Sequence, residues 1–249
     1  MEALGIDIGG TGIKGAPVDL ATGKLLTERK KIATPRPATP EAVTEVVREV
    51  AQSFGWTGPV GATFPGVVTS GTIRTAANVD KSWVGTDAAS MFGKALDTGV
   101  VVLNDADAAG IAEMTFGAGV GVKGSVLMLT FGTGVGSALF TDVVLVPNTE
   151  FGHIEIRGKD AEKRASENAK VARGWGWKDW TQRVSEYLQR MEALLSPGLI
   201  IVGGGISKEG DKWIPMLTGV QAKVVTATLH NDAGIVGAAL AAGGPATAG

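Results

Sequence analysis

The chain has 249 residues and a formal net charge of −2, and 44% of its residues are hydrophobic. This composition predicts one large folded domain or two smaller ones, and it excludes a long disordered chain. The lack of a basic excess argues against nucleic-acid binding, while two His and no Cys exclude disulfides, thiolate zinc sites and a Cys nucleophile. With no signal-peptide pattern and no apolar run of about 18 residues, we expect a cytoplasmic protein without a membrane partner.

Two Gly-rich hairpins are expected, one in each half of the chain. The first joins residues 4–7 to 13–18 through Gly9-Gly10-Thr11-Gly12, and the second joins residues 126–130 to 135–140 through Gly132-Thr133-Gly134. The two Gly-Thr-Gly triplets begin at 10 and 132, so they lie 122 residues apart, which is about half the chain. This spacing favours two similar domains, although two unrelated hairpins with the same turn would also produce it.

Apolar runs alternate with helical patterns in the rest of the chain. Strands are expected at residues 60–64, 100–103 and 199–202, and helices at 39–54, 107–116, 180–195 and 233–242. The alternation predicts an α/β fold, in which ligands bind beyond the carboxyl ends of the strands. The residues at those ends are Asp7, Pro65-Gly66, Asn104-Asp105, and the glycine clusters at 132–134 and 203–205.

The glycine clusters at these strand ends favour a phosphate ligand. Glycines let backbone N–H groups converge on an anion without obstruction by a Cβ. None of the clusters matches a P-loop, and the first is followed by a strand where a Rossmann fingerprint needs a helix. Each cluster alone is equally well explained as a tight turn.

Asn104-Asp105 places an acid beside an amide at a strand end. Such an acid can orient a hydroxyl group and accept its proton, which is what phosphoryl transfer needs besides held phosphates and a metal ion. The alternative is that Asn104-Asp105 caps the following helix. We expect Asp107 to be the cap, which leaves Asp105 for chemistry.

Glu150-Phe151-Gly152-His153, with Glu162 downstream, suits a turn that holds a polyhydroxylated ligand. A carboxylate accepts hydrogen bonds from two sugar hydroxyls, and an imidazole can donate or accept one more. A metal site is the weaker alternative, because the other His, His230, is distant in sequence. A purely structural role for His153 remains equally open.

Four segments resemble the ROK family of sugar kinases. They are residues 5–14, which read Gly-Ile-Asp-Ile-Gly-Gly-Thr-Gly-Ile-Lys; Leu103-Asn104-Asp105-Ala106; Glu150-Phe151-Gly152-His153; and residues 201–207, which read Ile-Val-Gly-Gly-Gly-Ile-Ser. In that order they resemble the family's phosphate motif, catalytic strand end, sugar-binding element and second nucleotide-side glycine turn. The resemblance implies a two-domain actin-like ATPase (ribonuclease H-like) α/β fold with the sugar in an interdomain cleft. Residues 1–106 would form the smaller domain, completed by a helix over 233–249, and residues 107–232 the larger.

The resemblance also implies a role for individual residues. The hexose would be held by Asn78, Asn104, Glu150, His153, Glu162, and Thr63 or Gly66. Asp105 would take the proton of the 6-hydroxyl. The donor phosphates would be bordered by Asp7, Gly9, Gly10, Thr11, Gly12, Lys14, Gly132, Thr133, Gly134 and Gly204. Mg²⁺ would bridge the phosphates and be held partly by water, so no all-protein metal site is expected.

Within this family the likeness is greatest to the actinobacterial glucokinases that use inorganic polyphosphate, some of which accept mannose. Residues 12–19, 152–156 and 231–239 carry it. Most ROK proteins have a Cys-rich zinc element after the Glu-x-Gly-His motif. Residues 157–166 lack Cys, so we expect no zinc, as in that subgroup. A homodimer is also implied.

The expected donor is polyphosphate, at least as good as ATP. A basic excess supports it, namely Arg157, Lys159, Lys163, Arg164, Lys170, Arg173 and Lys178 against Asp160, Glu162 and Glu167. Such a stretch could attract a linear polyanion, although a solvated helix face explains it equally well. The rival functions are an ATP-only kinase of another hexose, an acyl kinase, an actin-like filament protein and a sugar-binding ROK regulator. A regulator would need a DNA-binding domain, and the resemblance begins at residue 4.

Overall fold

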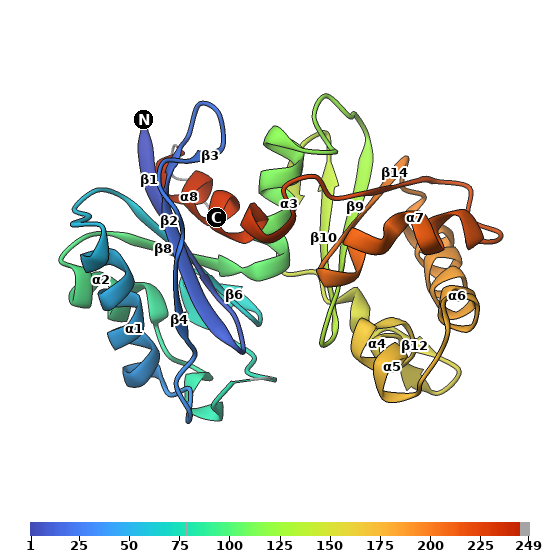
Figure 1. Ribbon diagram of the computed structural model, residues 1–249, viewed down its shortest axis with the longest axis horizontal. Coiled ribbons are helices and arrows are strands. Elements are labelled where there is room, and N and C mark those ends of the chain that lie inside the picture. Colours follow the sequence, from blue (N-terminus) through green and yellow to red (C-terminus); the bar gives the residue numbers. More distant parts are fainter. Residues whose placement is uncertain (78, 245–249) are drawn as a thin grey trace. The chain divides into compact units, whose positions relative to one another are not determined.

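The computed structural model describes residues 1–77 and 79–244, and the chain forms two compact units (Figure 1). Unit 1 comprises residues 1–112 and 232–249, and unit 2 comprises residues 113–231. Both connections between the units lie in or beside helices, the first inside α3 (Asp105–Phe116) and the second before α8 (Ala233–Gly243). No helix in the described ranges is long and apolar enough to cross a membrane.

Unit 1 is built on a six-stranded sheet in the order β3-β2-β1-β5-β8, with β4 also paired to β2. Its strands are β1 (Glu2–Ile8), β2 (Gly12–Asp19), β3 (Lys24–Leu25), β4 (Lys30–Ala33), β5 (Val60–Phe64) and β8 (Val100–Asn104). The β1–β2 hairpin is antiparallel, whereas β1–β5 and β5–β8 are parallel. The carboxyl ends of three parallel strands therefore meet at one edge, beside the hairpin turn.

Helices cover both faces of this sheet. Helices α1 (Pro40–Ser53) and α2 (Ala88–Leu96) lie on one face, and α8 lies on the other (Figure 1). The face toward α8 needs small residues, because a Cβ on Gly5 or Gly61 would collide with the α8 backbone at Ile235 or Ala238. The face toward α1 carries Leu4, Ile6 and Ile8, which form the core of this unit with Val43, Val47 and Val50. A small hairpin, β6 (Val68–Thr69) and β7 (Thr72–Ile73), follows β5.

Unit 2 repeats this arrangement. Its sheet has the order β11-β10-β9-β14-β15, built from β9 (Ser125–Phe131), β10 (Val135–Thr141), β11 (Val144–Val146), β14 (Leu199–Gly203) and β15 (Lys223–Thr226). The β9–β10 hairpin is antiparallel, and β9–β14 and β14–β15 are parallel. The two hairpins expected from the sequence thus occupy equivalent places in two similar sheets, each followed by parallel strands.

The rest of unit 2 consists of short elements and one long helix, α6 (Trp177–Leu195). The short strands and α-helices are β12 (Glu155–Ile156), β13 (Lys159–Asp160), α4 (Glu162–Ala165), α5 (Glu167–Ala172) and α7 (Gly210–Trp213), and 3₁₀ helices cover Phe151–His153, Gly205–Glu209 and Ile214–Met216. Trp180 and Tyr187 of α6 pack edge-on against Phe131 of β9, with ring centroids 6.0 and 6.4 Å apart, and Trp213 of α7 joins this cluster. The aromatic core therefore ties α6 to the sheet.

Candidate active site

In unit 1, Asn104 and Asp105 stand at the junction of β8 and α3. Asn104 Oδ1 accepts hydrogen bonds from the backbone N–H groups of Ala106, at 2.8 Å, and Asp107, at 3.0 Å. Asn104 is therefore the helix cap, and the expectation that Asp107 would be the cap is wrong: Asp107 lies in the first turn of α3 and is 2% exposed. Asp105 is the first residue of α3, and its side chain is exposed. Asp105 Oδ1 accepts a 2.9 Å hydrogen bond from the backbone N–H of the next residue, Ala106.

Asn104 also supports the turn that follows β5. Its Nδ2 donates a 3.1 Å hydrogen bond to the Gly66 carbonyl oxygen. The same turn is held a second time at the next residue, where Val67 N–H donates a 2.9 Å hydrogen bond to Thr75 Oγ1. Gly66 lies so close to Thr75 that a Cβ would collide with its carbonyl oxygen. The two expected sugar contacts Asn104 and Gly66 are thus joined to each other. Asn78, a further expected sugar contact, lies outside the described residues.

Asp7, at the end of β1, is held by two neighbours. The β1–β2 register places it opposite Lys14, whose Nζ is 2.8 Å from Asp7 Oδ2. Thr63 donates to Asp7 Oδ1 at 2.9 Å and accepts from Ile8 N–H at 3.1 Å. Thr63 is fully buried with its hydroxyl used in this way, so it supports Asp7 instead of offering a surface to a sugar.

The turn at residues 9–12 lies next to this pair. Gly9 N–H donates to the Gly12 carbonyl oxygen at 3.1 Å, and Thr34 Oγ1 donates to the Gly9 carbonyl oxygen at 2.5 Å. Gly10 and Thr11 are exposed at the tip. A tight, exposed glycine turn with an ammonium group at its base has the chemistry to bind phosphate.

In unit 2, Ser137 of β10 anchors the segment that carries Glu150. Its Oγ donates to the Thr149 carbonyl oxygen at 2.7 Å and accepts from Phe151 N–H at 3.0 Å, on either side of Glu150. The chain then forms a short 3₁₀ turn, Phe151–His153, in which His153 N–H donates to the Glu150 carbonyl oxygen at 3.0 Å. This turn projects the Glu150 and His153 side chains together.

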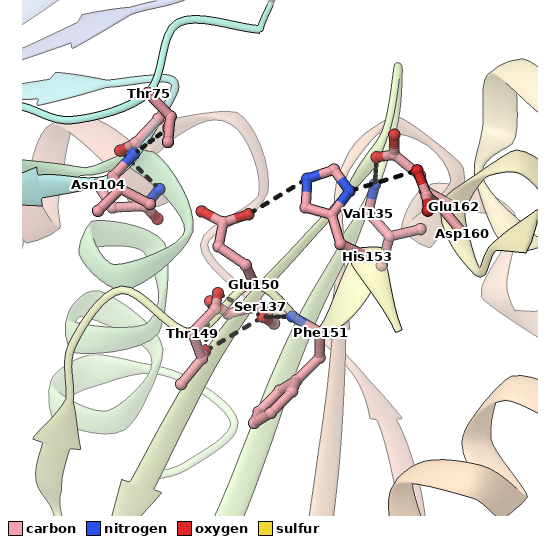
Figure 2. Close-up of polar contacts among 12 residues, drawn as sticks. Thr75, Asn104, Val135, Ser137, Thr149, Glu150, Phe151, His153, Asp160 and Glu162 are labelled. Atoms are coloured by element: carbon pink, nitrogen blue, oxygen red, sulfur yellow. Dashed lines mark hydrogen bonds and ion pairs between the residues drawn. The ribbon is translucent and has the colours of Figure 1, made fainter. Parts of the chain in front are cut away.

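His153 lies between two carboxylates, and Glu162 lies nearby (Figure 2). His153 Nε2 is 3.7 Å from Glu150 Oε2, and Nδ1 is 3.7 Å from Asp160 Oδ2. Glu162 Oε2 accepts a 3.3 Å hydrogen bond from Val135 N–H, which places it against the glycine turn of the β9–β10 hairpin. The three sugar residues expected from the sequence in this unit are thus brought together. Ligand atoms of His153, Asp160 and Glu162 all lie within 4.8 Å of one another.

The carboxylates of this cluster differ in acidity. Partial burial raises the pKa of Glu150, and the negative charge of Glu162 adds to this effect, while His153 opposes it. A hydrogen bond from Lys163, whose Nζ is 3.2 Å away, holds the pKa of Asp160 below its ordinary value. The pKa values of the two carboxylates facing His153 are therefore shifted in opposite directions.

The expected donor-side glycines of unit 2 form two turns. At residues 132–134, Gly132 N–H donates to the Gly134 carbonyl oxygen at 3.0 Å, and Asn168 N–H donates to the Gly132 carbonyl oxygen at 3.0 Å. Thr133 is exposed at the tip. After β14, Gly204 adopts φ 83°, which only glycine adopts readily, and a Cβ there would strike the Phe131 backbone.

The basic stretch is largely engaged within unit 2. Arg157 and Arg164 both pair with Glu186, at 2.6 and 2.7 Å. Lys170 lies 4.3 Å from the ring centroid of Trp177, and Arg173 lies 5.5 Å from that of Trp175. Because Lys163 pairs with Asp160, five of the seven basic side chains have partners in unit 2. Three of these five pair with carboxylates, and those pairs reduce the excess charge open to a ligand.

Sequence reasoning missed the residues that support this cluster. Trp180 Nε1 donates to the carbonyl oxygens of Ala165, at 2.9 Å, and Ser166, at 3.2 Å, and so holds the end of α4, whose first residue is Glu162. Ser137 and Asp160 have comparable roles. The spacing of these residues matches no motif, so only the folded chain identifies them as partners.

Two repeated α/β units, one with an Asn-Asp strand end and the other with a cluster of carboxylates and a histidine, are the features expected of a sugar kinase of the actin-like ATPase fold. The chain belongs to the ROK family, whose family model matches residues 3–165. This match, together with the relatives below, confirms the family resemblance and the fold class expected from the sequence.

Particular relatives agree with this assignment. The chain is 53% identical to a polyphosphate glucokinase of Mycobacterium tuberculosis (strain CDC 1551 / Oshkosh) over 96% of this chain and 91% of that protein. It superposes on the crystal structure of an inorganic polyphosphate/ATP-glucomannokinase from Arthrobacter sp. strain KM with a TM-score of 0.91 and 50% identity, covering 95% of this chain and 96% of that one. It also superposes on the crystal structure of a ROK family glucokinase from Streptomyces griseus in complex with glucose and AMPPNP. The TM-score is 0.82 and the sequence identity 27%, and the match covers 97% of this chain and 99% of that one.

Proposed function

We propose that this protein is a glucokinase that transfers a phosphoryl group from inorganic polyphosphate, and also from ATP, to the 6-hydroxyl of glucose. The observation that carries the proposal is the cluster of Glu150, His153 and Glu162, which presents two carboxylates and an imidazole on one surface of unit 2. A hexose offers several adjacent hydroxyl groups, and such a cluster can accept hydrogen bonds from them. The high identity to polyphosphate glucokinases supports this substrate.

In the proposed mechanism, Glu150, His153 and Glu162 hold the sugar together with Asn104, Gly66 and Asn78. Asp105 accepts the proton of the 6-hydroxyl as that oxygen attacks the terminal phosphorus of the donor. The reaction breaks the bond between the transferred phosphorus and the bridging oxygen, which leaves on the shortened donor. Asp105 suits this task because its side chain is exposed while Asn104 caps the helix.

The donor phosphates are proposed to contact the glycine turns. The turn at 9–12 lies beside the Asp7–Lys14 pair, and those at 132–134 and Gly204 lie in unit 2. As kinases, the relatives imply a divalent metal. We propose Mg²⁺, held mainly by phosphate oxygens and water, because Asp7 already contacts Lys14 and Thr63. We propose no zinc at His153, Asp160 and Glu162, because the Lys163 ammonium already lies 3.2 Å from Asp160.

Three finer points are also proposed. Mannose is a second substrate, as the glucomannokinase name suggests for that relative. The protein is a homodimer, which sedimentation would test. A strictly ATP-dependent kinase is the second candidate function, because the pairing of Arg157 and Arg164 with Glu186 reduces the charge open to a polyanion.

The test is the rate of glucose 6-phosphate formation with glucose plus polyphosphate and with glucose plus ATP, each with Mg²⁺, and with mannose in place of glucose. Asp105→Asn protein serves as the matched inactive control. Product formation with polyphosphate supports the proposal, and product formation with ATP alone selects the second candidate. No sugar phosphorylation from either donor would overturn both.

A further inference from the structure

The imidazole of His153 has a carboxylate at each nitrogen, as Figure 2 shows. A neutral imidazole carries one N–H donor and one acceptor nitrogen, so only one of Glu150 and Asp160 can receive a hydrogen bond from it. If Nε2 carries the proton, it points to Glu150, and the two sugar residues bind each other. If Nδ1 carries it, Nε2 is left as an acceptor beside Glu150.

The surroundings favour Asp160 as the partner of the N–H. Asp160 lies on the β12–β13 hairpin, opposite Glu155, and the next residue, Ala161, donates a 2.8 Å hydrogen bond to the Ile154 carbonyl oxygen. These contacts hold the segment directly after His153 in register with Asp160. The pKa of Asp160 is held low by the hydrogen bond with Lys163 and, to a smaller extent, by one with His153, whereas His153 acts on the pKa of Glu150 through its charge alone.

We propose that Asp160 is a positioning residue for sugar binding: it accepts the Nδ1–H of His153 and so keeps Nε2 free to accept a hydrogen bond from a hexose hydroxyl beside Glu150. The separation of 3.7 Å exceeds a hydrogen bond by about 0.5–1 Å, so a small ring rotation completes the contact. The role in sugar binding rests on the proposed function, but the position of the proton does not.

This arrangement makes Glu150 and His153 act together as acceptors. Sugar hydroxyls donate readily, so two adjacent acceptors match two adjacent hydroxyls. Without Asp160, the proton moves to Nε2 and the imidazole donates to Glu150. The sugar must then break that bond before it binds, whereas the donor phosphates, which contact other residues, are unaffected.

The chain is well suited to a direct test, because it contains only two His. Nitrogen-15 NMR of histidine-labelled protein distinguishes a protonated ring nitrogen from an unprotonated one, and exposed His230 is an internal reference. Spectra are recorded over a pH series that ends about two units above the ordinary imidazole pKa. The variants are Asp160→Ala, Asp160→Asn, whose side-chain carbonyl can still accept from Nδ1, and Lys163→Met as a control that leaves Asp160 in place.

We expect the Nδ1–H form of His153 in the wild type, in Asp160→Asn and in Lys163→Met, and the Nε2–H form in Asp160→Ala. The KM for glucose should rise about tenfold in Asp160→Ala and much less in Asp160→Asn, with kcat and the donor KM within about twofold.

A wild-type Nε2–H form, or an Asp160→Ala protein with unchanged protonation and glucose KM, would overturn the proposal. So would a His153 signal that shifts when a chelator is added, because it would place a metal ion at Nδ1. Failure of sugar phosphorylation in the wild type would instead overturn the proposed function, and the NMR result would stand separately.

Discussion

The side-chain amide of Asn104 donates a 3.1 Å hydrogen bond to the carbonyl oxygen of Gly66, 38 residues earlier in the chain. Its Oδ1 meanwhile caps α3 through the N–H groups of Ala106 and Asp107. One residue at the end of β8 therefore fixes both the turn after β5 and the first turn of α3, which carries Asp105. The position of the proposed base is coupled to that of the Gly66 turn.

Replacing Asn104 with Asp should separate these two contacts. A carboxylate can still cap α3, but it cannot donate to Gly66 and places a negative oxygen against that carbonyl. We expect the free energy of unfolding to fall by about 1–2 kcal/mol and kcat/KM for glucose to fall with it. Asn104→Ala, which loses both contacts, should lose about 2–3 kcal/mol. Denaturant titrations and steady-state kinetics measure both, and equal stability losses in the two variants would show that the Gly66 contact alone matters, because only the Ala variant loses the cap.

Replacing Asp105 with Asn should abolish most turnover without weakening the fold. The amide cannot accept the hydroxyl proton, so kcat should fall by about 10²–10⁴ while glucose affinity is kept. Because Asn104 supplies the cap, the free energy of unfolding should change by less than about 0.5 kcal/mol. Glucose binding by calorimetry, single-turnover assays and thermal melts test these points. A stability loss of about 1 kcal/mol with turnover retained would mean that Asp105 is a structural residue.

Glu150→Gln should change the pH dependence of both stability and sugar binding. Burial is the main cause that raises the Glu150 pKa in the folded state, so folding favours the protonated form. Its contribution to stability is then fully present below the unfolded pKa and is lost as pH rises through the folded pKa. The Gln variant should therefore be slightly more stable than wild type at pH 7, by a few tenths of a kcal/mol after solvent screening, and this advantage should vanish in acid.

Glucose binding should show the opposite dependence on pH, because the ionised form of Glu150 is the better acceptor. In the wild type, the glucose KM should rise as pH falls through the raised Glu150 pKa. The Gln variant should have a higher KM, by about tenfold, from the lost charged hydrogen bond, and no such pH dependence. Kinetics over a pH series, with the donor saturating, measure the glucose KM of both proteins. The same pH dependence in wild type and variant would mean that another group causes it.

Trp180→Phe should loosen Glu162 from a distance. The substitution removes the indole N–H that donates to Ala165 and Ser166 at the end of α4, and it leaves a small void in a fully buried site. We expect a loss of about 2–3 kcal/mol in stability and a raised glucose KM. Trp213→Phe is the matched control, since Trp213 shares the same aromatic cluster but donates to Ile206, at 3.4 Å, instead of α4. A similar glucose KM in both variants would show that Trp180 acts through stability alone.

The strands and long helices could be predicted because their signals are local. Thr39 accepts from Ala42 N–H and begins α1 as its Pro-rich start indicates, and the two hairpins follow from alternating apolar runs and glycine turns. The elements that were not predicted, such as β4, α2 and the β12–β13 hairpin, are short or lack strong periodicity. Of these, β4 exists through its pairing with β2, which its own residues do not reveal.

The site could be predicted at the level of residue types and less well at the level of roles. Glu150, His153 and Glu162 do cluster, but the sequence predicts the wrong cap for α3, because the rule for caps does not distinguish Asn104 from Asp107. Only the folded chain shows that Asn104 Oδ1 faces both amides. Likewise, the basic residues were counted without their partners, and Glu186, which pairs with Arg157 and Arg164, lies on α6, 29 and 22 residues away.

The choice of donor should depend on salt. Polyphosphate carries a negative charge on every unit, so a proposed binding path lined by exposed cations should weaken as salt rises, because charges are screened within about 10 Å at 0.1 M. Lys159 and Lys178 are the members of the basic stretch to test, because both are exposed and the other five contact partners within unit 2. In the double variant Lys159→Ala/Lys178→Ala, we expect the polyphosphate KM to rise about two- to fivefold, as for the loss of exposed ion pairs, with the ATP KM unchanged. Lys94→Ala, on α2 of unit 1, is the matched control.

Glucose 6-phosphate formation with each donor, from low to high salt, should show a steeper loss for polyphosphate in the wild type and a shallower one in the double variant. Equal salt slopes for the two donors, with no effect of the double variant, would mean that polyphosphate is bound only at the glycine turns.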